Sequence, residues 1–394
     1  MKNVKFSQAL AIALNAARTG AIETVELSDA LHRVLARHVT SDTDMPPFPR
    51  AVMDGYACRR RDLNLSLRIV GEVAAGEMPA VKVKERECVR IMTGAPMPDG
   101  ADCVVMVENT KQLDDHTIAL LAPQSAANIC PAGEDVKSGD VVLQKGTLLC
   151  AAHMAVLAAV GQAQVPVFRR PVVGIIATGN ELVEPNMSIG GAQIRNSNSY
   201  QTLAQVLGAG ALPKYFGIAD DTIDATRKMI ATAKAGCDVV IVSGGVSMGK
   251  YDRVPDALLA EGFAFKYTSV AMQPGKPTVF GVADDGTHCF GMPGNPVSSL
   301  VVFELIVKPF LYRLMGHDHT PRVVSATLSR ACERPKTDRL SSIPVRFTSP
   351  DEVTPVAYHG SAHIHAFCHA DGLVSLPEGV ARLERGSVVH VRCL

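Results

Sequence analysis

The 394-residue sequence lacks an excess of either charge, paired cysteines and long hydrophobic runs. Lysine plus arginine and aspartate plus glutamate number 39 each, which excludes an overall attraction to nucleic acid or to an anionic membrane. No run of about 20 apolar residues is available to cross a bilayer. The ten cysteines contain no CxxC pair, so we expect reduced thiols in a cytoplasmic protein rather than a disulfide framework. Any anion site must therefore be local.

The first 20 residues combine a basic start with an apolar stretch, as signal peptides do. However, Gln8 and Asn15 interrupt this stretch, and Phe6, Leu10 and Ala13 recur at helical spacing. We therefore expect an amphipathic helical region from residue 1 to about residue 40. The prolines at positions 46, 47 and 49 forbid a helix and mark a boundary.

Beyond this boundary the pattern of the sequence changes three times. Short apolar runs such as Leu67–Val73, separated by Gly, Pro and Asp clusters, predict a mainly antiparallel module to about residue 145. A helix is expected over 151–160. From Pro171, buried runs such as Val172–Ala177 alternate with expected helices over 197–207 and 222–234, which predicts a mostly parallel sheet covered by helices. After Pro321, strands return without helices and predict a separate β domain.

The α/β region contains three glycine-rich segments that follow expected strands: IIATGNEL from Ile175, IVSGGVSMGKYD from Ile241 and FGMPGNPVSS from Phe290. In open parallel sheets, ligands bind beyond the carboxyl ends of the strands, where glycines let a ligand approach the backbone. We therefore expect all three segments to face one crevice.

The third segment has the features of an anion seat. Asn295 fits a helix N-cap and Pro296 the first helical position, and the free N–H groups of a helix start attract anions. The second segment does not complete a phosphate-binding P-loop, because Tyr251 follows Lys250 where Ser or Thr is required. No GxGxxG motif of the dinucleotide-binding type opens the first helix.

Carboxylates gather near the same crevice, at Glu181, Asp220, Asp221 and Asp252. Beside an anion they would repel the ligand unless a hard cation such as Mg²⁺ lies between them. One of Asp220 and Asp221 is expected to serve the dipole of the following helix instead. Lys276, held between prolines in QPGKP, is a candidate partner for an oxyanion.

The sequence closely resembles the molybdopterin molybdenumtransferase family, which includes bacterial MoeA and the E domain of gephyrin. The resemblance runs almost from end to end, and its motifs occur in the family's order. They are MDGYA at Met53–Ala57, RIMTGAPMPDGAD at Arg90–Asp102, GED at Gly133–Asp135, ATGNEL, IRNSNSY at Ile194–Tyr200, SGGVSMGKYD, PGKP, GMPGNPVSS and HGS at His359–Ser361.

This resemblance implies the final step of molybdenum cofactor biosynthesis: Mg²⁺ helps to cleave the phosphoanhydride of adenylylated molybdopterin, and molybdate enters the dithiolene as AMP leaves. It also implies a homodimer whose active clefts are each built from both subunits. Molybdopterin adenylyltransferase and apo-molybdoenzymes are further expected partners, whereas nucleic acid and membranes are not. Two other functions compete with this one, molybdopterin adenylylation and a non-catalytic cofactor carrier or scaffold.

The fold implied is multidomain α/β plus β, with four domains. We expect a linking domain at 1–42 plus 146–170, a β-rich insertion domain at 43–145, a central α/β molybdopterin-binding domain with a mostly parallel sheet at 171–318, and a C-terminal β-barrel-like domain at 319–394.

The resemblance also assigns site residues by motif. The catalytic set is Asp54, Thr93, Glu181, Asp221, Asp252 and Lys276. Glu181, Asp221 and Asp252 would ligate Mg²⁺. The substrate-binding set is Gly179, Asn196, Ser197, Asn198, Ser243, Gly244, Gly245, Ser247, Pro274, Gly275, Pro293, Gly294, Asn295, Pro296, Arg339 and Ser361, in which Arg339 and Ser361, together with Lys276, resemble molybdate-binding positions.

Three features bear on oxyanion and metal binding. Gln273 stands where several family members carry a second lysine. The sequence RLSSIPVR loosens the family's Arg-x-x-aromatic spacing, so Arg339 and Arg346 are both candidates for the oxyanion. The histidines near His363 and His365 suggest a zinc site, but HxH on a strand only places two imidazoles on one face and no paired ligand set follows. We expect these histidines to lie on the surface or in loops.

Overall fold

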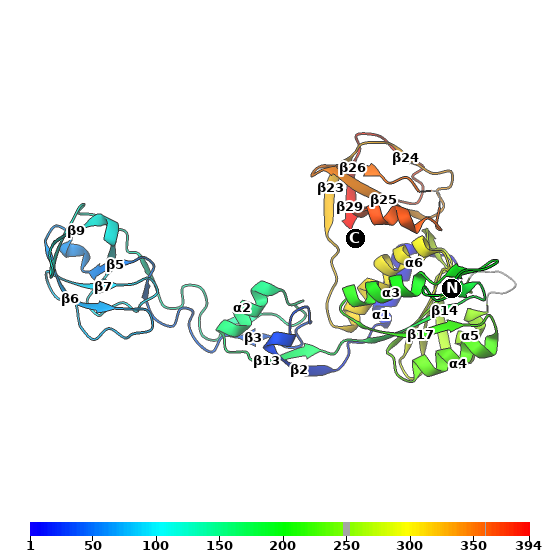
Figure 1. Cartoon of the computed structure of the whole chain (residues 1–394), viewed down its shortest axis with the longest axis horizontal. Coiled ribbons are helices and arrows are strands. Elements are labelled where there is room, and N and C mark those ends of the chain that lie inside the picture. Colours follow the sequence, from blue (N-terminus) through cyan, green and yellow to red (C-terminus); the bar gives the residue numbers. More distant parts are fainter. Residues whose placement is uncertain (247–252, 359) are drawn as a thin grey trace.

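The computed structural model describes residues 1–246, 253–358 and 360–394. The chain is elongated: a β-rich part lies at one end, a narrow middle part follows, and an α/β part with a second β part lies at the other end (Figure 1). In the described part of the chain, no helix is long and apolar enough to cross a membrane. Asp252 and Ser247, both predicted site residues, lie outside the described residues.

The central sheet has six strands, and its first four are parallel, as the alternating pattern predicts. The remaining two strands extend one edge of the sheet through antiparallel pairing, the fifth strand with the fourth and the sixth with the fifth. In spatial order the strands are β17 (Leu212–Ala219), β14 (Val172–Thr178), β18 (Val239–Ser243), β22 (His288–Met292), β21 (Val279–Ala283) and β19 (Phe263–Tyr267).

Helices cover both faces of this sheet, and successive strand residues point to opposite faces. Ile175 packs in the cluster shared with α3 and with the helical stretch that begins at α6, whereas Ile176 packs against α4 and α5. This alternation is why the strands are apolar throughout. The helices are α3 (Asn198–Gly208), α4 (Ile223–Lys234), α5 (Val254–Ala260), α6 (Pro296–Val302) and α7 (Lys308–Leu314), the last two joined by the π-helical turn η4 (Phe303–Val307).

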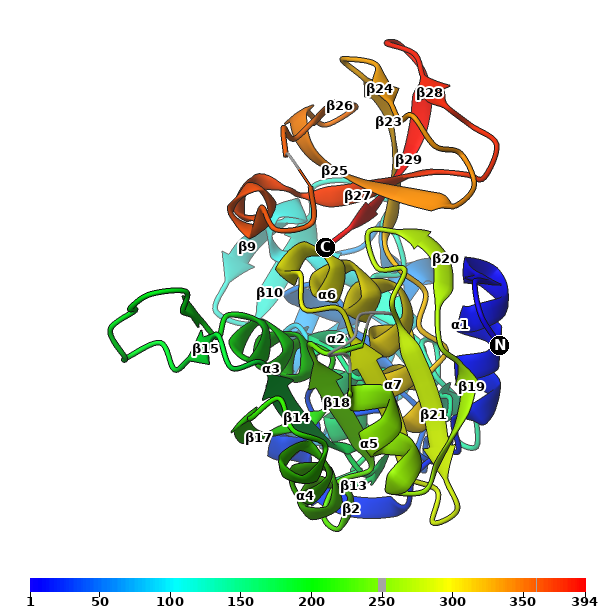
Figure 2. The same cartoon turned by 90° about the vertical axis from the view of Figure 1, so that its right-hand side faces the viewer.

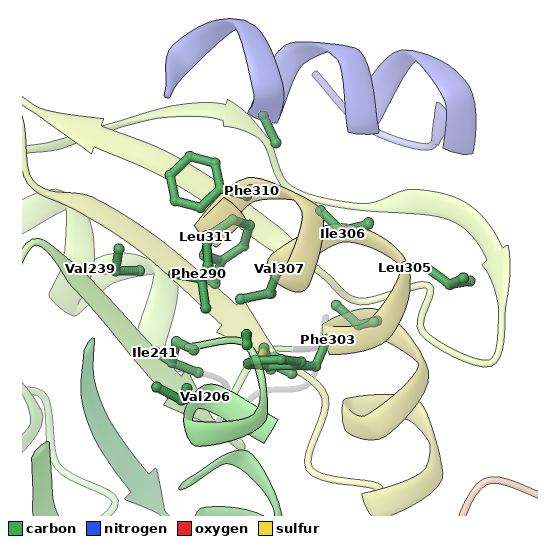
Figure 3. Packing of buried hydrophobic residues seen from close by; sticks show 14 of the residues in the cluster. Val206, Val239, Ile241, Phe290, Phe303, Leu305, Ile306, Val307, Phe310 and Leu311 are labelled. Atoms are coloured by element: carbon green, nitrogen blue, oxygen red, sulfur yellow. The ribbon is translucent and has the colours of Figure 1, made fainter. Parts of the chain in front are cut away.

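The larger core lies between the sheet and the α6–η4–α7 stretch. Phe290 of the sheet and Phe310 of α7 meet edge to face, with ring centroids 5.2 Å apart, and Phe303 is also fully buried (Figure 3). Burying an aromatic side chain of this kind contributes roughly 1.5–3 kcal/mol. This packing fixes α6, and therefore the start of α6, relative to the sheet.

The N-terminal prediction of helix to about residue 40 is wrong beyond Ala16. Helix α1 spans Phe6–Ala16, and the chain then forms β2 (Ile22–Glu26) and the 3₁₀ turn η1 (Leu27–Asp29). Gly20 lies between the helix and the β-branched residues Ile22, Thr24 and Val25, which favour a strand. Ala9 and Ala13 of α1 pack into the larger α/β core, and β1 (Val4–Lys5) pairs with β20 (Val270–Gln273).

The middle part has its own small core, in which Leu35 and Leu157 are fully buried. It consists of α2 (Ala151–Ala159), close to the expected 151–160, and short antiparallel pairs. These pairs are β2 with β13 (Gln164–Phe168), and β3 (Val39–Thr40) with β12 (Val141–Leu143). Only two chain segments connect this part to the β-rich end (Figure 1).

The β-rich end is a six-stranded, mainly antiparallel sheet, as predicted, with one parallel pair between β6 and β7. The predicted strand Leu67–Val73 is β6. In spatial order the strands are β8 (Cys103–Met106), β5 (Gly55–Cys58), β7 (Glu87–Ile91), β6 (Leu67–Val73), β10 (Thr117–Leu120) and β9 (Thr110–Asp114). A separate short pair is formed by β4 (Arg50–Ala51) and β11 (Ile129–Cys130). The 3₁₀ turns are η2 (Arg60–Asp62) and η3 (Val107–Asn109).

The C-terminal β part is joined to the α/β part through β20, which pairs with β1 on one side and with β25 on the other. This strand carries the predicted oxyanion loop directly to the domain boundary (Figure 2). The other strands are β23 (Val323–Leu328), β25 (Leu340–Ser349), β26 (Glu352–Pro355), β27 (Gly372–Leu376) and β29 (Val388–Cys393), with β24 (Cys332–Glu333) paired to β28 (Arg382–Leu383) and the 3₁₀ helix η5 (Ile364–His369) before β27.

Candidate active site

A cavity of about 710 Å³ lies at the carboxyl ends of β14, β18 and β22. The three glycine-rich exits meet there, as predicted from their positions after parallel strands. The predicted site residues that line the cavity are Gly179, Glu181, Asn196, Ser197, Asn198, Asp221, Ser243, Gly244, Gly245, Pro293, Gly294, Asn295 and Pro296. Predicted residues from Gly179 to Pro296, 117 positions apart, therefore line the same cavity.

Glycine is required at the exit of β18. Gly244 has φ +93°, and a Cβ atom there would lie 2.5 Å from the backbone oxygen of Thr178 on the neighbouring strand. At the exit of β14, a Cβ on Gly179 would lie 2.6 Å from Oε2 of Glu181, so the glutamate side chain folds back over this glycine. The missing side chains are what bring the backbone and the Glu181 carboxylate to the cavity.

Glu181 and Asp221 supply two carboxylates to the same cavity. Asp221 is fixed by a reciprocal pair of bonds: its Oδ2 accepts from the Asn180 backbone N–H at 3.2 Å, and its own N–H donates to Asn180 Oδ1 at 3.0 Å. Two carboxylates beside phosphate oxygens are the usual donor set for Mg²⁺, so these residues fit that ion. Among the described residues no third acidic, His or Cys side chain completes the group.

Neither Asp220 nor Asp221 is the N-cap of α4, and the expectation that one of them serves the helix dipole stays a prediction. Thr222 is the N-cap, and its hydroxyl accepts from the Ala225 N–H at 3.2 Å. This leaves the carboxylate of Asp221 directed to Asn180 and the cavity.

The start of α6 is as predicted in position but not in bonding. Asn295 is the N-cap and Pro296 the first helical residue, yet the Asn295 side chain makes no capping bond. It lines the cavity instead. The glutamines of α3 tie this helix to α6, because Gln201 Nε2 donates to the Pro296 oxygen at 3.3 Å and Gln205 Nε2 donates to the Leu300 oxygen at 3.2 Å. Both helices therefore begin at the cavity, side by side (Figure 2).

The C-terminal β part closes one side of the cavity through Ala362 and Ile364. The predicted site residue Ser361 is next to them, and its backbone oxygen accepts from the Val297 N–H in the first turn of α6 at 3.1 Å. The segment after residue 359 thus lies against α6. It is a loop followed by the 3₁₀ helix η5, and His363 and His365 are exposed there, as expected for surface or loop histidines.

Of the predicted oxyanion residues, Lys276 and Arg339 lie next to the junction between β20 and β25 rather than in the cavity wall. Gln273 and Lys276 are exposed, and Gln273 pairs in register with Ser341, two residues after Arg339. Pro274 and Gly275 are buried beneath them. The next residue, Pro277, does line the cavity. The junction is therefore adjacent to the cavity.

Arg339 and its rival Arg346 lie in different surroundings. Arg339 is half-buried, with Nε 3.3 Å from Oδ2 of Asp338. Arg346 lines a separate hollow of about 330 Å³ with Arg330 and His369. Because Arg339 shares the β20 junction with Gln273, it is the arginine that lies with the predicted oxyanion loop.

Asp54 and Thr93 lie together but in the β-rich part, at the opposite end of the chain from the cavity (Figure 1). The Thr93 backbone N–H and hydroxyl both donate to Asp54 Oδ1, at 2.6 Å and 2.8 Å. These two bonds hold the pKa of the exposed Asp54 carboxyl below its usual value. Within one chain, this pair does not contribute to the cavity.

Several residues that line the cavity were not predicted. They are mostly immediate neighbours of predicted positions, namely Thr178, Leu182, Ile194, Arg195, Val246, Pro277, Ala362 and Ile364. Their closeness in the sequence to predicted site residues could have suggested them. Glu184 and Tyr215, which were also missed, lie behind the cavity wall and belong to none of the motifs, whereas Tyr200 beside them is the last residue of IRNSNSY.

Comparison with known families gives three consecutive matches along the chain. Residues 4–161 match the MoeA N-terminal region (domain I and II), residues 174–313 match a family described as a probable molybdopterin binding domain, and residues 327–394 match the MoeA C-terminal region (domain IV).

Individual relatives match over nearly their whole length. The chain is 34% identical to a molybdopterin molybdenumtransferase of Bacillus subtilis, over 95% of this chain and 90% of that protein. It is also 34% identical to one of Staphylococcus aureus (strain Mu50), over 93% and 90%. Among solved structures, a molybdopterin biosynthesis MoeA protein from Pyrococcus horikoshii OT3 superposes with a TM-score of 0.86 at 29% identity, covering 100% of both chains.

Proposed function

The chain belongs to the molybdopterin molybdenumtransferase (MoeA) family and acts in the final step of molybdenum cofactor biosynthesis, and we propose that its cavity binds adenylylated molybdopterin for Mg²⁺-dependent molybdate insertion and AMP release. The observation that carries this proposal is the meeting of three glycine-rich strand exits and two carboxylates in one cavity of about 710 Å³. Bare backbone suits phosphate oxygens, and paired carboxylates suit a divalent cation beside them.

Each wall of the cavity has a separate task in this proposal. The exits at Gly179, Gly244 and Gly294 let the substrate approach the backbone, and the starts of α3 and α6 offer N–H groups to its phosphates. Ser197, Asn198 and Asn295 orient the pterin end. The rest of the substrate surface packs against four further lining residues, Ser243, Gly245, Pro293 and Pro296.

Glu181 and Asp221 would hold Mg²⁺, and Asp252 is proposed to join them from outside the described residues. When bound, this ion neutralises phosphate oxygens and favours cleavage of the phosphoanhydride. Asn180 keeps the Asp221 carboxylate in place through its two hydrogen bonds. The protein therefore places the carboxylates of Glu181 and Asp221 beside a site for phosphate, so that a cation can bind between them and the phosphate oxygens.

Molybdate, the second substrate, would bind at the junction of β20 and β25 beside the cavity. Lys276 supplies a positive charge there, Arg339 a guanidinium and Ser361 a hydroxyl, while Pro274 and Gly275 shape the loop. A dianionic oxyanion is held by such groups through charge-assisted hydrogen bonds. Gln273 contributes hydrogen bonding without charge.

We further propose that the active form is a homodimer, in which Asp54 and Thr93 of a second copy complete each cleft. Their position at the far end of the elongated chain supports this proposal, because they cannot reach the cavity of their own chain without a large rearrangement (Figure 1). Molybdopterin adenylyltransferase and apo-molybdoenzymes are the proposed partners before and after the reaction, and a cytoplasmic location stays a prediction.

The two alternative functions are separated by one assay. Purified protein is incubated with adenylylated molybdopterin and Mg²⁺, with and without molybdate, and AMP and reconstitution of an apo-molybdoenzyme are measured. Molybdate-dependent AMP release with reconstitution supports insertion. Tight binding without release under every oxyanion tested would overturn the proposal in favour of a carrier or scaffold, and net formation of the adenylylated substrate from ATP would favour an adenylyltransferase.

A further inference from the structure

A chain of hydrogen bonds runs behind the cavity wall and includes Glu184 and Tyr215, which belong to none of the motifs. Asn196, which is 1% exposed, donates from Nδ2 to the hydroxyl of Tyr215 at 2.8 Å. The Tyr215 hydroxyl in turn bonds Glu184 Oε1 at 2.5 Å. Tyr200 bonds the other oxygen of the same carboxylate at 3.1 Å. The chain therefore connects the cavity wall, the edge strand β17 and the segment that follows β15 (Leu182–Val183).

The direction of each bond is determined by chemistry. A carboxylate only accepts, so the Tyr215 hydroxyl must donate to Glu184 and is left to accept from Asn196. At its other end, Asn196 Oδ1 accepts from the Ser199 backbone N–H at 3.2 Å, which can only donate. The Asn196 amide thus has one orientation, imposed from both sides. Burial and the bond to Glu184 raise the pKa of Tyr215, which keeps its hydroxyl protonated as the donor.

This orientation matters because Asn196 begins the segment that enters α3. Its backbone N–H also donates to the Val183 oxygen at 2.8 Å, and β16 (Ile194–Arg195) pairs with β15. The two residues that follow, Ser197 and Asn198, line the cavity at the start of α3. Both polar atoms of the Asn196 side chain bond to the protein. Asn196 therefore fixes the position of the residues next to it and does not offer a free polar group to a ligand.

We propose that Glu184 and Tyr215 are positioning residues for substrate binding: through the Asn196 amide they hold Ser197 and Asn198 against the adenylylated molybdopterin in the cavity. Neither lines the cavity itself. This inference rests on the proposed function, because its readout is the binding of that substrate. Tyr215 lies on the α3 face of β17 and the adjacent Phe216 on the α4 face, as the alternation of a strand requires, and from the α3 face Tyr215 reaches Asn196.

Tyr200 provides a matched control within the same cluster. Its ring lies 5.9 Å from that of Tyr215, and it bonds the same carboxylate, but no bond connects it to Asn196 in the described structure. Tyr200→Phe therefore removes one phenol from Glu184 without breaking the link to the cavity. Tyr215→Phe removes the same group and breaks that link.

The test compares steady-state AMP release for the wild type, Tyr215→Phe, Tyr200→Phe, Glu184→Leu and Glu184→Gln at saturating molybdate. We expect Tyr215→Phe and Glu184→Leu each to raise the KM for adenylylated molybdopterin about tenfold with kcat retained, the effect of losing a buried hydrogen bond to a charged group. Tyr200→Phe should change KM less than about twofold. Glu184→Gln keeps one acceptor oxygen for Tyr215 and should restore most of the affinity.

The outcomes separate this inference from the proposed function. If the wild type itself releases no AMP in response to molybdate, the proposed function fails. If the wild type is active but Tyr215→Phe and Tyr200→Phe have equal KM values, or if Tyr215→Phe lowers kcat at unchanged KM, the positioning role is overturned. The double variant Glu184→Leu/Tyr215→Phe should have no higher KM than either single variant, since both break one chain of bonds; additive effects would also refute the inference.

Discussion

Replacing Gly244 by alanine should damage both the fold and the cavity, because two separate costs fall on one methyl group. Gly244 has φ +93°, a conformation that L side chains rarely adopt, and a left-handed residue costs roughly 1–2 kcal/mol when it is not glycine. In addition, the new Cβ would lie 2.5 Å from the Thr178 backbone oxygen. That oxygen belongs to β14, which is held by parallel pairing between β17 and β18.

The steric cost can be isolated with a second glycine. Gly286 has nearly the same conformation, φ +88°, but a Cβ there would meet nothing within 4 Å. Gly286→Ala therefore carries the conformational cost alone. Overpacking against fixed backbone adds typically ~1–3 kcal/mol, so we expect Gly244→Ala to lower the free energy of unfolding by about 2–5 kcal/mol and Gly286→Ala by about 1–2 kcal/mol.

Urea unfolding of both variants, followed by circular dichroism, measures this difference, and AMP release measures its effect on the cavity. Gly244→Ala should lose most activity because the displaced exit lines the cavity, whereas Gly286→Ala should keep it. Equal destabilisation of the two variants would refute the argument that the close approach of β14 and the β18 exit requires glycine.

Three further predictions follow from single groups. Asp221→Asn should raise the Mg²⁺ concentration needed for half-maximal AMP release at least about tenfold while leaving the unfolding midpoint unchanged, because it removes a cation ligand rather than a core contact; an unchanged Mg²⁺ requirement would contradict the metal assignment. Gln273→Lys should lower the molybdate concentration for half-maximal insertion by adding positive charge at the β20 junction, and an equal or higher requirement would mean that residue 273 does not face the oxyanion. Burial and the nearby charges of Arg392 and Lys308 lower the pKa of His319 from 6.5 to about 4. Between these pH values the unfolded chain binds a proton at His319 that the folded protein does not, so the free energy of unfolding should fall as the pH drops from about 6.5 towards 4. His319→Gln should reduce this pH dependence in thermal unfolding, and an unchanged dependence would assign it to other groups.

The parallel sheet and its strand exits could be predicted because each depends on local pattern. Continuous apolar runs such as Val172–Ala177 mark strands covered on both faces, and β14 extends only one residue beyond that run. Glycines directly after such runs identify the ligand edge of the sheet whatever the strand order is. Tyr215 could not be predicted in this way, because its link to the cavity wall consists of hydrogen bonds to Asn196 and Glu184, which are 19 and 31 positions away in the sequence.

The N-terminal error has a similar cause. Helical spacing in α1 is clear, but nothing in the spacing reveals where the helix ends or which core its apolar face joins. In the structure, Ala13 packs with the α/β core, while Val25, only 12 positions later, packs against the separate core of the middle part. Tertiary contacts between segments far apart in sequence decide this assignment.

Asp54 and Thr93 illustrate what neither local pattern nor the fold of one chain supplies. The two residues bond to each other within the β-rich part. Yet the exposed carboxylate keeps a lowered pKa and so stays charged at neutral pH. Asp54 lies in the β-rich part, which only two chain segments connect to the rest of the protein (Figure 1). Its carboxylate can therefore act in a cavity only if another molecule approaches that end of the chain. The catalytic assignment of this pair and the proposal of a homodimer therefore stand or fall together: a strictly monomeric but fully active protein would exclude both.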